Sequence, residues 1–287
     1  MMENVRIYEV GPRDGLQNEK AIVPTQTKIA LIDLLSQAGF SHIEATSFVP
    51  AKWVPQMADA TEVLNGINRA QGVSYAALTP NIIGYEKALA AKADEVAIFG
   101  AASETFSQKN INCTIAESIE RFIPIVERAR ADGVPVRGYV SCVVGCPYEG
   151  DIAPEAVAQI AAKLFELGCY EISLGDTIGA GTPEKIIAML NAVKQHVPVD
   201  KLAGHYHDTN GNALDNVKAS LNEGLRNFDS AIGGLGGCPY APGAKGNVST
   251  VKLAHMLERE HYHTGLNFDV LAKAEALISM LGENHDR

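Results

Sequence analysis

The sequence predicts an α/β protein folded as a TIM (β/α)8 barrel with an additional C-terminal helix. Eight short runs rich in β-branched residues alternate with longer amphipathic runs. No linker or low-complexity segment divides these runs, so they form one continuous series along the 287 residues. This length suits a closed barrel, which typically takes about 250 residues, followed by an extension.

The order of the elements follows from these runs. Helical spacing fills the intervals; Val157, Ile160 and Leu164, for example, recur on one helix face behind Pro154. Gly133 and other glycines stand where helices should stop, shortly before the next strand. The expected strands are residues 5–11, 41–47, 73–79, 94–100, 134–142, 170–177, 201–208 and 227–234.

We expect one catalytic domain spanning residues 1–287, with a helical extension at about 267–287. Leu271, Ala274 and Ile278 lie at core spacing within that extension. A doubly wound open sheet is the alternative fold. It would usually show a GxGxxG turn after its first strand, whereas this turn reads GPRDGLQN.

Composition narrows the class of function. The formal net charge of −10 argues against general attraction to nucleic acid or to an anionic membrane surface. The longest nonpolar runs fall well short of the ~20 residues that a membrane span needs. Five cysteines form an odd set without a CxxC pair, and the first residues leave no room for a signal peptide. We therefore expect a soluble cytoplasmic protein.

The stretch HYHDTNGN places two imidazoles near the end of the seventh expected strand. Residues two apart on a strand face the same way, so His205 and His207 can share one ligand. An isolated HxH is at least as often a hydrogen-bonded pair as a metal site. Its position at the C-terminal end of a barrel strand, where barrel enzymes assemble their sites, favours the metal.

Barrel closure supplies the remaining ligands of this expected site. Strand eight lies between strands seven and one, so residues that follow strands one and eight should approach the histidines. Asp14 follows the first strand and Asn247 follows the eighth. Together with His205 and His207 they could hold one divalent cation, for which Mg²⁺ or Mn²⁺ suits the donors better than a closed zinc site. Zinc remains an alternative.

Three other side chains end strands at the same rim. Arg13 would bring a planar donor fork to an oxygen that gains negative charge, although RDG alone is more often a surface turn. Glu44 lies in a nonpolar run, so we expect it to be buried and paired. Asp176 could orient Arg13, a water or a substrate hydroxyl, but an Asp after a strand more often caps the following segment.

The glycine-rich segment GGLGGCPYAPGAKGN follows the eighth strand and carries Cys238. A long loop at the active rim of a compact domain is more often functional than idle, and we interpret this one as a lid. Cys238 is the thiol that we expect to act chemically, as a proton donor or acceptor. Cys142, Cys146 and Cys169 are expected to be small buried hydrophobic residues or residues at strand ends.

These motifs resemble those of 3-hydroxy-3-methylglutaryl-CoA lyases, which are metal-dependent enzymes built on the TIM barrel. The resemblance runs from about residue 5 to about residue 281, and RDGLQ and GGCPYA are its most specific parts. It implies metal ligands at Asp14, His205, His207 and Asn247. The other catalytic positions that it implies are Arg13, Glu44, Asp176 and Cys238. The segments that carry it are EVGPRDGLQNEK, IEATSFV, FGAASE, GYVSCVVGCPYEG, EISLGDTIG, HYHDTNG and GLGGCPYAPGAKGN.

The reaction implied by the resemblance is cleavage of 3-hydroxy-3-methylglutaryl-CoA to acetyl-CoA and acetoacetate, a step of leucine breakdown and ketone-body formation. It also implies a homodimer, and contacts to CoA from Lys20 and Asn110. Lys52, Lys109 and Lys245 are further candidates to balance the CoA phosphates, although lysines are more often solvated surface charges. The alternatives are a related aldolase or Claisen-type synthase and a catalytically silent barrel used as a scaffold.

Overall fold

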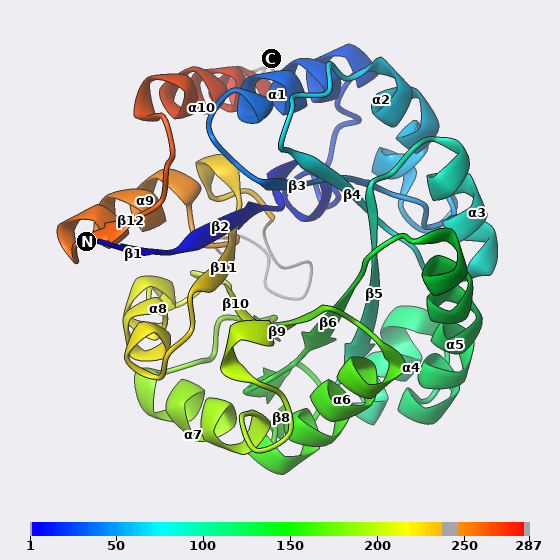
Figure 1. Cartoon of the computed structure of the whole chain (residues 1–287), viewed down its shortest axis with the longest axis vertical. Helices are drawn as coiled ribbons and strands as arrows, with labels where there is room; N and C mark the ends of the chain where they lie inside the picture. Colours follow the sequence, from blue (N-terminus) through cyan, green and yellow to red (C-terminus); the bar gives the residue numbers. More distant parts are fainter. Residues whose placement is uncertain (1, 237–245, 284–287) are drawn as a thin grey trace.

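The computed structural model describes residues 2–236 and 246–283, and in this part of the chain eight parallel strands close into a barrel (Figure 1). The predicted TIM barrel is therefore confirmed, and each barrel strand overlaps one predicted run. In order around the barrel the strands are β10 (Leu202–Tyr206), β11 (Asn227–Ser230), β2 (Arg6–Glu9), β3 (His42–Ser47), β4 (Ser74–Leu78), β5 (Glu95–Ala101), β6 (Val136–Ser141) and β9 (Glu171–Asp176).

Helices surround the barrel, and their ends carry the expected signals. Pro154 occupies the first turn of its helix, and Gly133 and Gly168 adopt the left-handed conformation just past the ends of two others. The helices are α1 (Thr25–Ser36), α2 (Ala60–Gly66), α3 (Ile82–Ala90), α4 (Glu104–Ile111), α5 (Ile115–Asp132), α6 (Pro154–Leu167), α7 (Pro183–Val193), α8 (Ala213–Asn222), α9 (Thr250–Arg259) and α10 (Phe268–Glu283).

Short elements complete the fold. The expected C-terminal helix is α10, which packs beside α1 at the top of Figure 1. The short helical turns are the π-helical η1 (Gly11–Gly15) and the 3-10 turns η2 (Pro55–Met57), η3 (Val199–Lys201) and η4 (Ile232–Gly234). Two small sheets pair β1 (Glu3–Asn4) with β12 (Tyr262–His263) and β7 (Gly145–Cys146) with β8 (Gly150–Asp151).

The barrel strands separate a nonpolar layer from a polar interior. Outward residues such as Ile7, Leu174 and Phe228 join the large hydrophobic cluster that also includes the helices. The residues that alternate with them point inward and include Arg137 and Asp229, which are 0% and 1% exposed. Barrel interiors are more often filled by branched aliphatic side chains. Buried charges therefore crowd the inside of this barrel, where each needs a partner.

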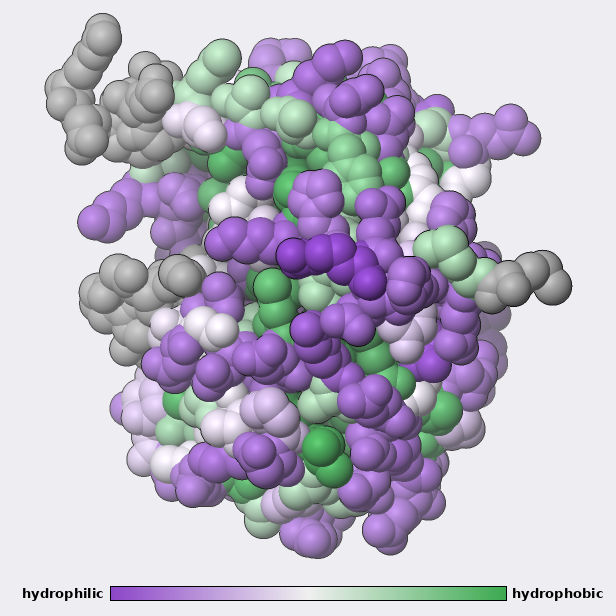
Figure 2. Space-filling view, turned by 90° about the vertical axis from the view of Figure 1, so that its left-hand side faces the viewer, coloured by the Kyte–Doolittle hydropathy of each residue, from purple (hydrophilic) through white to green (hydrophobic). Residues whose placement is uncertain are grey.

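Figure 2 views the molecule from the side on which α8 and α9 lie, and hydrophilic residues cover most of that face. Hydrophobic residues show mainly in its upper half. Within the described residues, every helix is too short or too polar to cross a membrane.

Candidate metal centre

The chain makes a tight turn directly after β2, and this turn carries Arg13 and Asp14. Residues Gly11–Gly15 form the single π-helical turn η1, with Pro12 near its start. A side chain at position 11 would collide with the Glu9 carboxylate, because an added Cβ would lie 2.5 Å from Glu9 Oε1. Gly11 therefore allows the backbone to pass close to Glu9. Such π-helical turns are rare and occur frequently at functional sites.

Three side chains from distant parts of the sequence converge at the carboxyl-terminal rim, the end of the barrel at which the strands finish. Asp14 Oδ2 lies 3.8 Å from His205 Nε2 and 3.9 Å from His207 Nε2. The two Nε2 atoms are 3.4 Å apart. The three donor atoms thus lie within 4.8 Å of one another, a spacing that one metal ion could bridge.

Asn247 adjoins this cluster and brings an amide oxygen. Its backbone forms an isolated antiparallel bridge with His207, and its Nδ2 donates to Asp14 Oδ2 at 2.7 Å. The side-chain oxygen Oδ1 is buried without a hydrogen-bond partner. A buried carbonyl oxygen without a partner is costly in a folded protein, and a cation would satisfy it. The donor set of one carboxylate, two imidazoles and one amide oxygen therefore fits a divalent metal.

A buried carboxylate fixes the orientation of His205. Asp229 Oδ2 lies 3.0 Å from His205 Nδ1 and also accepts from Ser173 Oγ at 2.7 Å. Arg137 donates to both oxygens of Asp229, at 2.7 and 3.1 Å. An Asp that holds the proton on Nδ1 leaves the Nε2 lone pair free for a metal, as is usual for histidine ligands.

The two imidazoles differ in their tendency to take up a proton. Burial lowers the pKa of both, but the hydrogen bond and the charge of Asp229 outweigh burial at His205 and raise its pKa. For His207, burial and the nearby His205 lower the pKa to about 4. His207 is therefore neutral at physiological pH, which is the state that binds a metal.

Arg13 is held between two carboxylates. It donates to Glu44 Oε2 and to Asp14 Oδ1, each at 2.6 Å, and its guanidinium lies 5.4 Å from the centre of the Tyr139 ring. Burial raises the pKa of Glu44 despite this pairing. Burial would also raise the pKa of Asp14, but Arg13 and the two histidines hold it at about 2. Asp14 is therefore ionised, and Arg13 is fixed beside the candidate metal ligands.

The structure places the other candidate residues differently. Asp176 caps the loop after β9, because it accepts from the backbone N–H groups of Ala180 at 3.0 Å and Gly181 at 2.8 Å. Burial raises its pKa to about 6. Lys20 and Asn110 are both exposed, on the loop before α1 and on α4. Cys238 and Lys245 lie outside the described residues.

Sequence reasoning missed Asp229, Arg137 and Gln17, which donates to Asp14 Oδ1 at 2.9 Å. Asp229 had a visible signal, since it is a carboxylate inside the strand-like run NFDSAIGG. The register of β11 decides which residue Asp229 meets, because Asp229 lies directly beside His205 of β10. The partner strand could not be read from the run alone.

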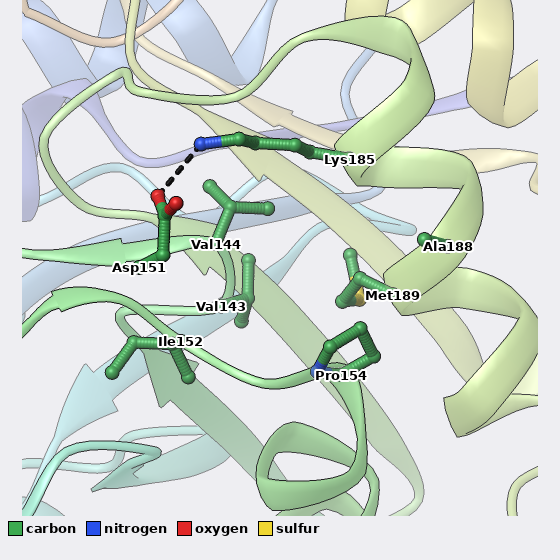
Figure 3. Close-up of a pocket in the computed structure, with 8 residues that line it drawn as sticks. All are labelled: Val143, Val144, Asp151, Ile152, Pro154, Lys185, Ala188 and Met189. Atoms are coloured by element: carbon green, nitrogen blue, oxygen red, sulfur yellow. Dashed lines mark hydrogen bonds and ion pairs between the residues drawn. The ribbon is translucent and has the colours of Figure 1, made fainter.

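A separate small pocket lies between the β7–β8 hairpin and α7 (Figure 3). Its volume is about 160 Å³, and its walls are mostly nonpolar. Lys185 and Asp151 pair at its edge at 2.7 Å. None of the residues that line it belongs to the metal cluster. This pocket is therefore separate from the candidate metal centre.

Comparison with known proteins links this geometry to a family. The family model described as HMGL-like matches residues 4–278. The mitochondrial hydroxymethylglutaryl-CoA lyase of Bos taurus is 60% identical over 96% of this chain and 85% of its own length. The crystal structure of the HMG-CoA lyase from Brucella melitensis superposes with a TM-score of 0.96 at 59% identity, covering 97% of this chain and 99% of that one. An Acinetobacter baumannii HMG-CoA lyase solved with coenzyme A and 3-methylmalate gives 0.91 at 39% identity, with 96% and 92% covered.

Proposed function

The chain belongs to the HMGL-like family, and we infer that it acts as a hydroxymethylglutaryl-CoA lyase, cleaving 3-hydroxy-3-methylglutaryl-CoA to acetyl-CoA and acetoacetate. The observation in the structure that best supports this chemistry is the convergence of Asp14, His205 and His207 beside the fixed guanidinium of Arg13. A related aldolase, a Claisen-type synthase or a silent scaffold is not favoured by relatives of this identity.

The cation would be held by Asp14, His205, His207 and Asn247. A bound divalent cation would polarise the C3 hydroxyl and a neighbouring oxygen of the substrate, which eases loss of the hydroxyl proton. We propose Mg²⁺ or Mn²⁺, since half of these donors are hard oxygens. The unpaired Asn247 Oδ1 supports its place in the set.

Arg13 is proposed to stabilise the enolate of acetyl-CoA. When the C2–C3 bond breaks, its electrons move onto C2 and the thioester oxygen, while the C3 hydroxyl becomes the ketone of acetoacetate. A guanidinium already fixed by Glu44 and Asp14 needs little reorganisation to meet this negative charge. Glu44 and Asp176 are proposed as supports, Glu44 for Arg13 and Asp176 for the loop after β9.

The hydroxyl proton passes to Asp14 or to His205. A carboxylate whose pKa lies at about 2 is a poor acceptor. His205 carries its proton on Nδ1, toward Asp229, and its Nε2 lone pair is assigned to the cation, so it could accept the hydroxyl proton only while Nε2 is not coordinated. We therefore propose His205 as the base for a state in which Asp14, His207 and Asn247 alone would hold the cation.

Cys238 is proposed to return a proton to C2 of the departing enolate. The described residues on either side of its segment support this position. An added Cβ on Gly236 would lie 2.5 Å from Asn247 Nδ2 and 3.2 Å from the Asp14 backbone oxygen. Gly236, two residues before Cys238, therefore lies beside two proposed metal ligands.

Product analysis tests this function. The purified protein with Mg²⁺ or Mn²⁺ should convert 3-hydroxy-3-methylglutaryl-CoA to acetoacetate and acetyl-CoA in equal amounts. Removal of divalent cations by a chelator should abolish the conversion, and added cation should restore it. Full turnover in a chelator-stripped sample would contradict the mechanism, and a condensed product would indicate a synthase.

We further propose a homodimer that works in the cytoplasm, on the pathway of leucine degradation and ketone-body formation. The four cysteines of the described residues are all free thiols, which supports a reducing compartment. Sedimentation measures the oligomeric state, and cell fractionation separates a cytoplasmic location from the mitochondrial one named for the Bos taurus relative.

A further inference from the structure

Glu9 is a buried carboxylate with no role so far in the proposed reaction. It is the last residue of β2, is 0% exposed, and points to the outward side of the strand together with Ile7. Its Oε1 accepts from the N–H groups of Gly11 at 2.8 Å and Ile232 at 2.9 Å, and its Oε2 accepts from Thr250 Oγ1 at 2.6 Å. One side chain thus joins three segments that are far apart in the sequence.

The first of these segments carries Asp14. Gly11 begins η1, and an added Cβ on Gly11 would lie 3.2 Å from the Ile232 nitrogen, so η1 and η4 are in close contact beside Glu9. Within η1, the N–H group of Asp14 donates to the carbonyl oxygen of Val10 at 2.8 Å. The position of Asp14 therefore depends on the backbone that Glu9 holds.

The other two donors flank Asn247. Ile232 begins η4, and the carbonyl oxygen of Leu235, just past this turn, accepts from the backbone N–H and the Nδ2 of Asn247, each at 3.1 Å. Thr250 begins α9, three residues past Asn247. Both β11 and α9 contact β2 (Figure 1). Glu9 therefore lies where the two segments that carry candidate ligands meet.

The charge of Glu9 has no cationic partner among the described residues, because its three donors are all neutral. Burial raises the pKa of Glu9 to about 7, and the hydrogen bonds offset this only in part. The charged or titratable side chains of the adjoining elements are engaged elsewhere: Arg13 and Asp14 of η1, His42 and Glu44 of β3 and Asp229 of β11 have other partners, and Lys252, His255, Glu258 and Arg259 of α9 are exposed.

A neutral side chain of the same shape could satisfy the same donors. A glutamine oxygen could accept from the two N–H groups, and its Nε2 could donate to Thr250 Oγ1. A buried carboxylate without a cation lowers stability when it is ionised, so its charge does not serve the fold. What the charge adds is strength, since hydrogen bonds to an ionised acceptor are roughly twice as strong as neutral ones.

We propose that Glu9 is a positioning residue of the metal centre, and that its negative charge holds the segments of Asp14 and Asn247 in the arrangement that binds the cation. Ionised Glu9 draws the N–H groups of Gly11 and Ile232 onto one oxygen, and this fixes η1 against η4. This assignment rests on the proposed metal-dependent function.

The rival role for Glu9 is purely structural. In that role the carboxylate only satisfies three donors, and any loss of metal affinity on substitution would accompany a loss of stability. The positioning role predicts the opposite relation, in which removal of the charge stabilises the folded protein and weakens metal binding.

Glu9→Gln separates the two roles. Calorimetric titration should show Mn²⁺ affinity about tenfold below wild type at about pH 8, and a much smaller difference at about pH 6, where Glu9 of the wild type is largely protonated. The folded pKa of Glu9 lies above its unfolded value, so the wild type loses stability as pH rises through this window. The denaturation midpoint of the metal-free variant should therefore rise relative to wild type between the same two pH values.

Glu95→Gln is the matched control, because burial also raises the pKa of Glu95, which accepts from Tyr8 and Tyr170 away from the metal centre. It should show the gain in relative stability without the loss of Mn²⁺ affinity. Wild-type Mn²⁺ affinity in Glu9→Gln at about pH 8, or a loss of affinity that is equal at both pH values, would overturn the proposal.

Thr250→Val provides a second test that leaves Glu9 in place. It removes one of the three donors to the carboxylate, so Glu9 should keep its proton to a higher pH. The pH at which Mn²⁺ affinity falls should therefore move upward, and Thr250→Ser, which keeps the hydroxyl, should restore it. An unmoved midpoint in Thr250→Val would contradict the role of the charge.

These measurements separate this proposal from the proposed function. If the wild-type protein does not cleave the thioester but Glu9→Gln weakens Mn²⁺ binding in the way described, the lyase assignment fails and the role of Glu9 stands. If the wild type cleaves it and Glu9→Gln keeps the wild-type kcat and Mn²⁺ affinity, the role of Glu9 fails and the lyase assignment stands.

Discussion

The two ends of the barrel interior are both polar, but they differ in how fully their polar atoms are paired. At the amino-terminal end Glu95 accepts from the hydroxyl groups of Tyr8 at 2.7 Å and Tyr170 at 2.8 Å. Glu171 binds Arg137 at 2.8 Å and also pairs with Arg6. Arg6 Nε is the one side-chain atom of this group that is buried without a partner. This end is nearly complete by itself.

The carboxyl-terminal rim is incomplete by the same measure. Asn247 Oδ1, Glu44 Oε1 and His207 Nδ1 are buried without hydrogen-bond partners. The imidazole Nε2 atoms of His205 and His207 face each other at 3.4 Å, beside the Asp14 carboxylate. Asn247 Oδ1 and the two facing Nε2 atoms are acceptors that a cation would satisfy, so the comparison distinguishes a paired network from a candidate binding site.

Asp229 belongs to both regions. It accepts from Arg137, which pairs with Glu171 of the amino-terminal network, and it orients His205 at the rim. The network therefore supports the geometry of the site without contacting a ligand. Substitutions at the rim, at Asp229 and in the network should accordingly differ in whether they change metal binding, activity or stability.

The largest effect is expected at the rim. Asp14→Ala should lower kcat/KM by more than about 1,000-fold, because it removes a proposed ligand and the partner of Arg13 together. Calorimetric titration should show that Mn²⁺ affinity falls in parallel. Asp200→Ala, at a carboxylate 71% exposed, is the matched control and should change neither quantity. Wild-type Mn²⁺ affinity in Asp14→Ala would remove Asp14 from the ligand set.

Substitution of Arg13 should slow the reaction with little effect on metal affinity. Arg13→Lys keeps a positive charge but loses the planar fork that binds Glu44 and Asp14 simultaneously. We expect kcat to fall about 100-fold or more, as for the loss of a donor to a developing oxyanion, and Mn²⁺ affinity to change only a few-fold. Arg259→Lys on the surface of α9 is the control. An unchanged kcat would show that Arg13 does not meet the enolate.

The sequence was sufficient to predict the barrel, because the outward sides of the strands carry nonpolar residues that recur visibly in each run. The sequence also predicted that Asp14 and His205 lie close together, because closure of a barrel makes strands from opposite ends of the chain neighbours. These predictions depend on local pattern and on topology, which a single sequence contains.

The sequence was not sufficient for features that depend on a partner elsewhere. The π-helical turn η1 is shaped by Glu9, which accepts from the N–H groups of Gly11 at 2.8 Å and Ile232 at 2.9 Å. Arg137 lies in a β-branched run, and its role comes from carboxylates on two other strands. A charged residue predicted to be buried indicates that a partner exists, but the sequence does not identify that partner.

Asp229→Asn should lower Mn²⁺ affinity by about 10- to 100-fold, the usual cost of disturbing a group that orients a ligand. Asn has one acceptor oxygen where Asp229 has two, so it cannot accept from both Arg137 nitrogens and from His205 Nδ1, and His205 loses its fixed orientation. Ser173→Ala is the matched control, because it removes one donor to the same carboxylate and leaves His205 and Arg137 in place. Wild-type metal affinity with lowered stability in Asp229→Asn would show that Asp229 serves only the structural network.

The smallest effect on the site is expected from Glu95, deep in the network. Burial raises its pKa, so the folded protein holds this proton more tightly than the unfolded chain. Its contribution to stability is therefore present at low pH and is lost as pH rises from the unfolded pKa through the raised folded value.

Glu95→Gln keeps an acceptor for Tyr8 and Tyr170 but cannot ionise. In denaturant titrations, the stability of the wild type relative to this variant should fall over that pH window. Mn²⁺ affinity should stay within about twofold, because substitutions at sites without shared partners usually act independently. A large loss of metal affinity would mean that the two ends of the barrel are coupled and that their separation into network and site is wrong.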